Sequence, residues 1–195
     1  MRTKLFLFIP PVLVAAAACG GSTAQLSTAG HHGTAGDKPQ SVVVPAGSTG
    51  PSMCRTSGLS VKLGGSNGAA GSIYRPLIFT NTGTASCTLR GYPGVSFVAP
   101  KSGDQVGAAG SRNAQHAVTT VTLAAGGSAS AVVQIVDEGN YPPSRCKASA
   151  VSGLRVYPPG NTDAAYVAFG SNSTACSTDV GGLTVMAVVG GTAGM

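Results

Sequence analysis

The chain has 195 residues, of which 43% are hydrophobic, only 9% are charged and none is Trp. Disordered chains combine low hydrophobicity with high net charge, so this composition predicts a folded body with a core of small and β-branched side chains. The net charge is +6, but the basic residues are scattered along the sequence. Nucleic-acid-binding surfaces need clustered Lys and Arg, so the sequence argues against that class of partner.

The N-terminus has the form of an export signal. Two basic residues precede an apolar run at residues 5–18, and small residues lead directly into Cys19, a pattern that resembles the bacterial lipobox. We therefore expect residues 1–18 to be a signal peptide, cleaved so that Cys19 carries acyl chains into the membrane. A plain secretory signal is the alternative. The apolar run is shorter than the roughly 20 residues of a transmembrane helix.

Residues 19–51 are predicted to be the lipidated cysteine and a flexible linker. They are rich in Gly, Ser, Thr and Ala and contain three prolines. Such a segment cannot bury enough surface to offset its conformational entropy, so it is expected to be disordered. Its Gly-rich coil would hold the following domain away from lipid headgroups.

Residues 52–191 alternate short apolar stretches with turn residues, which is typical of β-strands. A glycine-rich turn is expected at residues 64–68, and residues 118–123 and 129–136 are expected to pair as a hairpin around residues 125–127. These elements predict an all-β fold, an antiparallel, immunoglobulin-like β-sandwich. The expected strands in chain order are 59–63, 74–80, 87–90, 95–98, 118–123, 129–136, 151–157, 166–169 and 183–189.

Once Cys19 is assigned to lipid, an even number of cysteines remains. In an exported domain, four cysteines predict two disulfides, and three connectivities are possible by counting alone. Sequential pairing would close two loops of similar length. The spacing contains no C-x-x-C pair and histidines are few, so no zinc site is expected. The four are Cys54, Cys87, Cys146 and Cys176.

Two motifs resemble a known family. Residues 79–83 read Phe-Thr-Asn-Thr-Gly, and residues 87–95 read Cys-Thr-Leu-Arg-Gly-Tyr-Pro-Gly-Val. This pattern resembles the actinobacterial family called domain of unknown function 4232, and the resemblance covers roughly residues 54–189. It implies a β-sandwich carried on secreted proteins and lipoproteins, and it implies no activity. Ala125 departs from the family pattern, where a proline is usual before the glycine.

The sequence offers weak candidates for chemistry. Ser66 lies in a G-x-S-x-G match, but a nucleophile elbow needs a helix after the serine and a downstream His and acid. His116 is the one downstream histidine, and it lies in a polar loop. Asp137 and Glu138 are the densest acidic pair and are expected to form a turn. We therefore expect no catalytic residue, no metal site and no cofactor.

The predicted function follows from location more than from chemistry. We expect a lipoprotein anchored at the extracytoplasmic face of the cell membrane, with a non-catalytic binding or structural module. Its expected partners are the membrane, through the N-terminal lipid, and an envelope protein or cell-wall polymer. Because loops carry recognition, we expect binding at residues 64–72 or 101–117. The alternative is a secreted hydrolase acting on cell-wall or lipid substrates.

Overall fold

The computed structural model describes residues 50–193. The predicted signal peptide, Cys19 and nearly all of the predicted linker lie outside these residues. The described residues belong to the compact unit Ala46–Met195. Frequent Gly and Pro limit helix to short turns, as the sequence predicts. These turns are η1 (Thr56–Gly58), η2 (Glu138–Asn140) and α1 (Pro143–Cys146).

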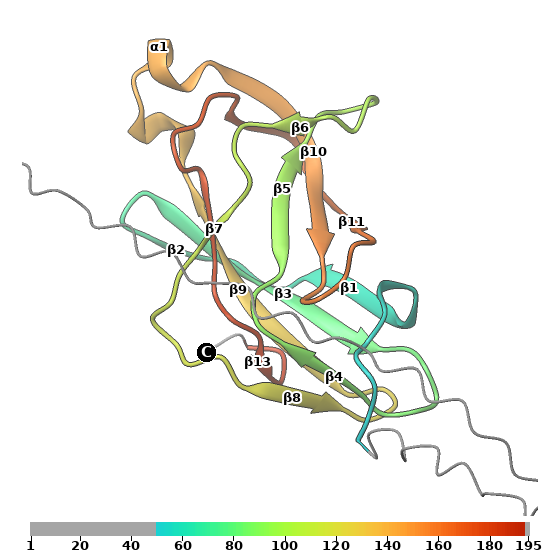
Figure 1. Cartoon of the computed structure of the whole chain (residues 1–195). Coiled ribbons are helices and arrows are strands. Elements are labelled where there is room, and N and C mark those ends of the chain that lie inside the picture. Colours follow the sequence, from blue (N-terminus) through green and yellow to red (C-terminus); the bar gives the residue numbers. More distant parts are fainter. Residues whose placement is uncertain (1–49, 194–195) are drawn as a thin grey trace, which may run out of the picture. The chain divides into compact units, whose positions relative to one another are not determined.

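The strands of the described region form two main sheets and a separate pair, and the predicted antiparallel β-sandwich is confirmed (Figure 1). The order of the larger sheet is β1-β3-β9-β12-β7, with β2 beside β3 and β13 beside β9. Its strands are β1 (Leu59–Leu63), β2 (Asn67–Ala69), β3 (Ser72–Asn81), β7 (Ser111–Arg112), β9 (Ser128–Val136), β12 (Leu183–Val185) and β13 (Val189–Gly190).

The second sheet has the order β11-β10-β5-β6, and β4 and β8 pair apart from both. All of its pairings are antiparallel, whereas β7 joins the larger sheet through a parallel contact with β12. The remaining strands are β4 (Cys87–Arg90), β5 (Gly94–Val98), β6 (Gln105–Val106), β8 (Thr120–Leu123), β10 (Ala148–Tyr157) and β11 (Ala165–Cys176).

The core lies between the two main sheets, and alternate residues of β3 enter it. Leu77 and Phe79 of β3 and Leu154 of β10 are fully buried. Leu154 lies opposite Phe97 of β5, which is also buried. Because successive side chains of a strand point to opposite faces, the alternation in the sequence sets which residues enter this core.

Asn81, at the end of β3, is the polar centre of one end of the sandwich. It is 3% exposed, and its amide nitrogen donates to the carbonyl oxygens of Ala85 (2.9 Å), Leu123 (3.1 Å) and Ala124 (3.2 Å). Its side-chain oxygen accepts the Gly83 amide at 2.9 Å. The Asn81 side chain therefore caps the turn at the end of β3, and the cap also reaches the segment after β8.

This network corrects the predicted hairpin of residues 118–123 with 129–136. β8 pairs with β4, and β9 pairs with β3. The backbone of Asn81 occupies the turn instead, since its amide donates to Gly127 and its carbonyl accepts from Gly126, both at 2.9 Å. The Ala125-Gly126-Gly127 turn therefore passes the chain from one sheet to another.

The predicted glycine turn at residues 64–68 is also wrong in its position. Residues 67–69 form β2, which pairs with β3. The chain reverses at Ala70 and Gly71, whose φ angles are 48° and 72°. A two-residue hairpin turn of this kind needs positive φ at both positions, where Asn or Gly is usual. Ala is an unusual residue at such a position, so the residue types at 70 and 71 did not indicate this turn in the sequence.

Two disulfides link the predicted cysteines in the sequential connectivity. Cys54 bonds Cys87, and Cys146 bonds Cys176. The first holds the segment entering the domain beside β4, where the Cys54 amide donates to the Thr88 carbonyl at 2.9 Å. The second joins the end of α1 to the end of β11. Each bridge therefore ties a segment outside the central strands to the sandwich.

We predict that Asn81→Ala lowers the free energy of unfolding by about 2–4 kcal/mol, since it leaves buried carbonyls without their donor. Asn81→Asp should cost at least as much, because it keeps the shape of the side chain but turns a carboxylate toward three carbonyl oxygens. Urea unfolding followed by circular dichroism measures both. The control is Asn113→Ala, which removes a similar bond to the Gln115 amide in an exposed loop. An Asn81→Asp variant as stable as the wild type would contradict this role.

Each disulfide is predicted to contribute about 3–4 kcal/mol, the chain-entropy value for loops of this length. Cys54→Ala/Cys87→Ala and Cys146→Ala/Cys176→Ala should each shift the urea midpoint accordingly. The reduced wild-type protein should lose more than either variant, because it lacks both bridges. A double variant with an unchanged free energy of unfolding would contradict this prediction, because it would show that closing that loop does not stabilise the domain.

Candidate functional site

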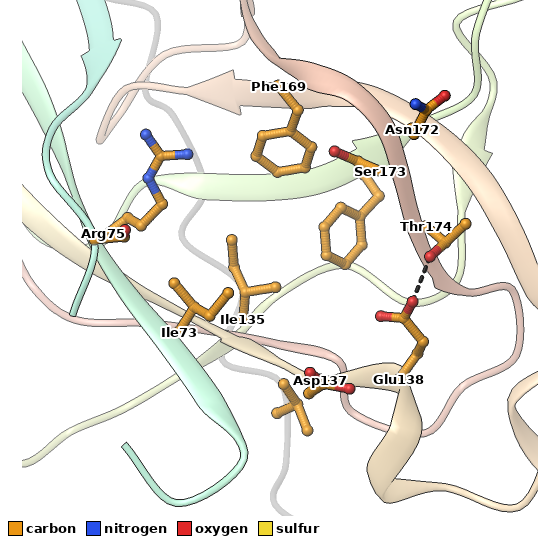
Figure 2. A pocket seen from close by; sticks show the side chains of 12 residues that line it. Ile73, Arg75, Ile135, Asp137, Glu138, Phe169, Asn172, Ser173 and Thr174 are labelled. Atoms are coloured by element: carbon orange, nitrogen blue, oxygen red, sulfur yellow. Dashed lines mark hydrogen bonds between the residues drawn. The ribbon is translucent and has the colours of Figure 1, made fainter. Parts of the chain in front are cut away.

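A cleft of about 330 Å³ opens between the two main sheets, near the start of β3 and the end of β9. Figure 2 shows its walls: Arg75 at one side, Ile73 and Ile135 along the floor, and Asp137 and Glu138 at the other side. The volume is at the lower end of the range for small-molecule sites. The remaining lining residues are Ser66, Phe97, Val136, Phe169, Asn172, Ser173 and Thr174.

The floor continues the inward row of β3 and β9 beyond the core. Along β3 this row runs from buried Phe79 and Leu77 through Arg75 to Ile73, which is 43% exposed. Ile73 lies directly opposite Ile135 of β9 in the register. The row therefore passes from a closed core to an open apolar surface, and Arg75 stands at the transition.

Arg75 is held by the loop between β1 and β2. Its Nε and Nη2 donate to the Gly64 carbonyl oxygen at 3.2 and 3.0 Å. The guanidinium is partly buried, and no carboxylate of residues 50–193 lies within ion-pair distance of it. Both bonds go to one oxygen, so most of the five N–H donors of the group are left for other partners.

Two aromatic rings form the back of the cleft on the second sheet. Phe97 of β5 is buried, and Phe169 of β11 is partly buried against it, with ring centroids 6.0 Å apart at an angle of 59°. Tilted pairs of this geometry are favourable for aromatic rings. Between Ala168 and Ser173, β11 departs from its register with β10, since Gly153 pairs Ala168 but Val151 pairs Ser173. The irregular stretch forms a bulge in β11, and β11 residues 172–174 at and after it line the cleft.

The acidic wall is built by the turn that follows β9. The Asp137 side chain caps η2 by accepting the Gly139 amide at 2.8 Å. Glu138 accepts a hydrogen bond from the Thr174 hydroxyl, the contact drawn in Figure 2. The prediction that these two acids form a turn between elements is therefore confirmed. Thr174 lies two residues before Cys176, so the second disulfide supports this wall.

The sequence candidates for hydrolysis are not brought together. Ser66 lines the cleft, but a strand and no helix follows it, so the elbow geometry is absent at this serine. His116 is exposed and lines a different hollow, together with Tyr74, Pro76 and Val132. Of the loops expected to bind, residues 64–72 contribute Ser66 and residues 101–117 contribute nothing to this cleft.

The rest of residues 50–193 contains neither a metal-binding cluster nor a membrane-spanning helix. No group of three or more His, Cys, Asp or Glu side chains is placed to hold a metal ion in this part of the chain. None of its helices is long and apolar enough to cross a membrane.

A hollow on the outer face of the second sheet carries Tyr166, whose hydroxyl donates to the Ser152 carbonyl at 2.8 Å. Its ring covers Gly153, where a Cβ would meet the Val167 carbonyl oxygen.

Arg75 is the site residue that the sequence analysis missed, although the sequence contains its signal. In the alternating pattern of β3, the inward positions are Ile73, Arg75, Leu77 and Phe79. A charged residue in such a row breaks the rule that core-facing positions are apolar, and such exceptions are expected at functional sites. The contribution of β11 carried no comparable signal, because it depends on the bulge.

The comparisons with known proteins identify a family and leave its activity open. No curated protein and no solved structure matches the chain. One family model matches residues 54–189, which include both disulfides, Asn81 and every residue of the cleft. The chain therefore belongs to the family described as "domain of unknown function (DUF4232)".

Proposed function

We propose that the protein is a lipoprotein at the extracytoplasmic face of the cell membrane and that its domain binds a ligand without catalysing a reaction. The inter-sheet cleft is the proposed binding site. The observation that carries this proposal is the composition of the cleft: apolar floor and aromatic wall, charged groups at both sides, and no histidine. Such a combination of apolar surface with a few placed polar groups is typical of ligand sites.

The location rests on the N-terminal sequence. A basic start, an apolar run and Cys19 after small residues support lipid attachment of the bacterial lipoprotein type. One acyl chain gives only marginal membrane binding, so stable anchoring takes two or more chains. Two disulfides in the domain support an oxidising compartment, because such bonds are rare in the cytosol.

The entry segment of the domain and the first disulfide suit this arrangement. The segment at Met53 bridges Thr88 of β4, and the adjoining Cys54 is bonded to Cys87. The domain is therefore fastened at the point where the linker enters it. An envelope protein or a cell-wall polymer would reach the cleft from the opposite side of the sandwich, since the cleft lies at the other end of β3.

The competing function is a secreted hydrolase. It would need a nucleophile, a base and an acid in one place. The separation of Ser66 and His116 into two different hollows supports binding over hydrolysis.

Mass spectrometry of the mature protein is expected to find an acylated N-terminal Cys19. Changing Cys19→Ser should abolish acylation and release the protein from the membrane fraction or leave the signal uncleaved. A mature wild-type protein with an unmodified N-terminus at another residue would refute the anchor.

The cleft is expected to bind a neutral apolar probe, N-phenyl-1-naphthylamine, with a saturable rise in probe fluorescence. The protein for this test is residues 20–195 exported behind an unrelated cleavable signal, which avoids detergent. Ile73→Asp should weaken binding roughly tenfold by placing a charge on the apolar floor. The matched control is Met53→Asp, since Met53 is also an exposed large hydrophobic residue, at 51%. Equal effects of both changes, or no saturable binding, would contradict the proposed site.

A further inference from the structure

The position of Arg75 is unusual for an arginine. It occupies the inward position of β3 two residues before fully buried Leu77, at the mouth of the core. Placing a cation against apolar surface is unfavourable unless an anion or several acceptors compensate it. Within residues 50–193, the guanidinium of Arg75 donates to one acceptor, the carbonyl oxygen of Gly64. The charge of Arg75 is thus oriented by the fold but is not neutralised by any carboxylate within residues 50–193.

The two acids of the cleft do not supply that partner. Asp137 accepts the Gly139 amide, and Glu138 accepts the Thr174 hydroxyl. Figure 2 places both carboxylates across the isoleucine floor from the guanidinium. The cleft therefore has a cationic side and an acidic side with apolar surface between them.

This charge distribution limits what the cleft can accept. A guanidinium with free N–H donors recognises carboxylates and phosphates through paired hydrogen bonds, and a carboxylate matches its planar fork with a single negative charge. The isoleucines and the two phenylalanines offer contact to an apolar body. A second negative charge on that body would approach Asp137 and Glu138 and would be repelled.

We infer that the cleft binds a monoanionic amphiphile, a single carboxylate on an apolar body, with the carboxylate at Arg75. This rests on the proposed function of the cleft as a binding site and adds the chemical class of its ligand. The bonds to Gly64 fix the guanidinium before the ligand arrives, so little side-chain freedom is lost on binding. The apolar body lies along Ile73 and Ile135 toward the aromatic wall.

The test uses the neutral probe as a reporter and three competitors that share one alkyl chain: decanoate, decanol and decylamine. In the wild-type protein, residues 20–195, decanoate should displace the probe at about a tenfold lower concentration than decanol, the difference expected of a charge-assisted pair. Decylamine should compete no better than decanol. Equal displacement by decanoate and decanol, or strongest displacement by decylamine, would overturn the inference.

Variants assign the preference to Arg75. In Arg75→Gln, decanoate and decanol should displace the probe equally, each compared at that variant's own affinity for the probe, and Arg75→Lys should retain part of the preference. Arg90→Gln is the matched control, because it removes the same charge from an exposed position of β4. An unchanged decanoate preference in Arg75→Gln would overturn the role of Arg75. Thermal unfolding of each variant shows whether the fold is intact.

The outcomes separate the inference from the proposed function. If the neutral probe does not bind the wild-type protein, the cleft is not an apolar binding site and both statements fail. If the probe binds but the competitors show no preference for the anion, the binding site stands and the ligand class is wrong.

Discussion

The hydrogen bonds of Asn81 are the interaction on which the rest of the sandwich depends. One buried side chain joins the end of β3 to the segment before β4 and to the end of β8. Its backbone also holds the turn that leads into β9. Three separate stretches of chain are therefore brought together by one residue. Because the group is almost completely buried, losing these bonds leaves several polar atoms without water or protein partners.

The two disulfides stabilise what this centre does not reach. The core has few aromatic residues and no Trp, and most of its buried side chains are Val, Ala and Leu. One bridge holds the chain where it enters the domain, and the other holds α1 against the end of β11. The second bridge thereby supports Glu138 and Thr174, the acidic wall of the cleft. The Cys146–Cys176 bridge therefore stabilises the domain and also supports the proposed binding site.

The success of prediction differed between elements for physical reasons. Alternation of apolar residues predicted the central strands, because it reflects the two faces of a strand directly. The prediction of a hairpin of residues 118–123 with 129–136 failed because the pairing was decided by Asn81, which lies 42 positions before Leu123. The sequence placed the glycine-rich turn at residues 64–68, whereas the turn lies at Ala70 and Gly71. The prediction failed because the positive φ angles of these two residues are imposed by the pairing of β2 with β3. Among the cleft residues, Arg75 could have been predicted from the sequence, because it is a charged residue in an otherwise apolar row of β3.

By itself, the sequence determined the fold class, the four bridged cysteines and the motif around Asn81, because composition, periodicity and residue type are local properties. It also contains the export pattern at Cys19 on which the proposed location rests. Only the tertiary structure decided the connectivity of the disulfides, the exchange of strand partners around Asn81, and the cleft. The cleft combines β3, β5, β9 and β11, and β11 residues at and after a bulge form its last wall. Such a site depends on the distances between sheets, which no local pattern records.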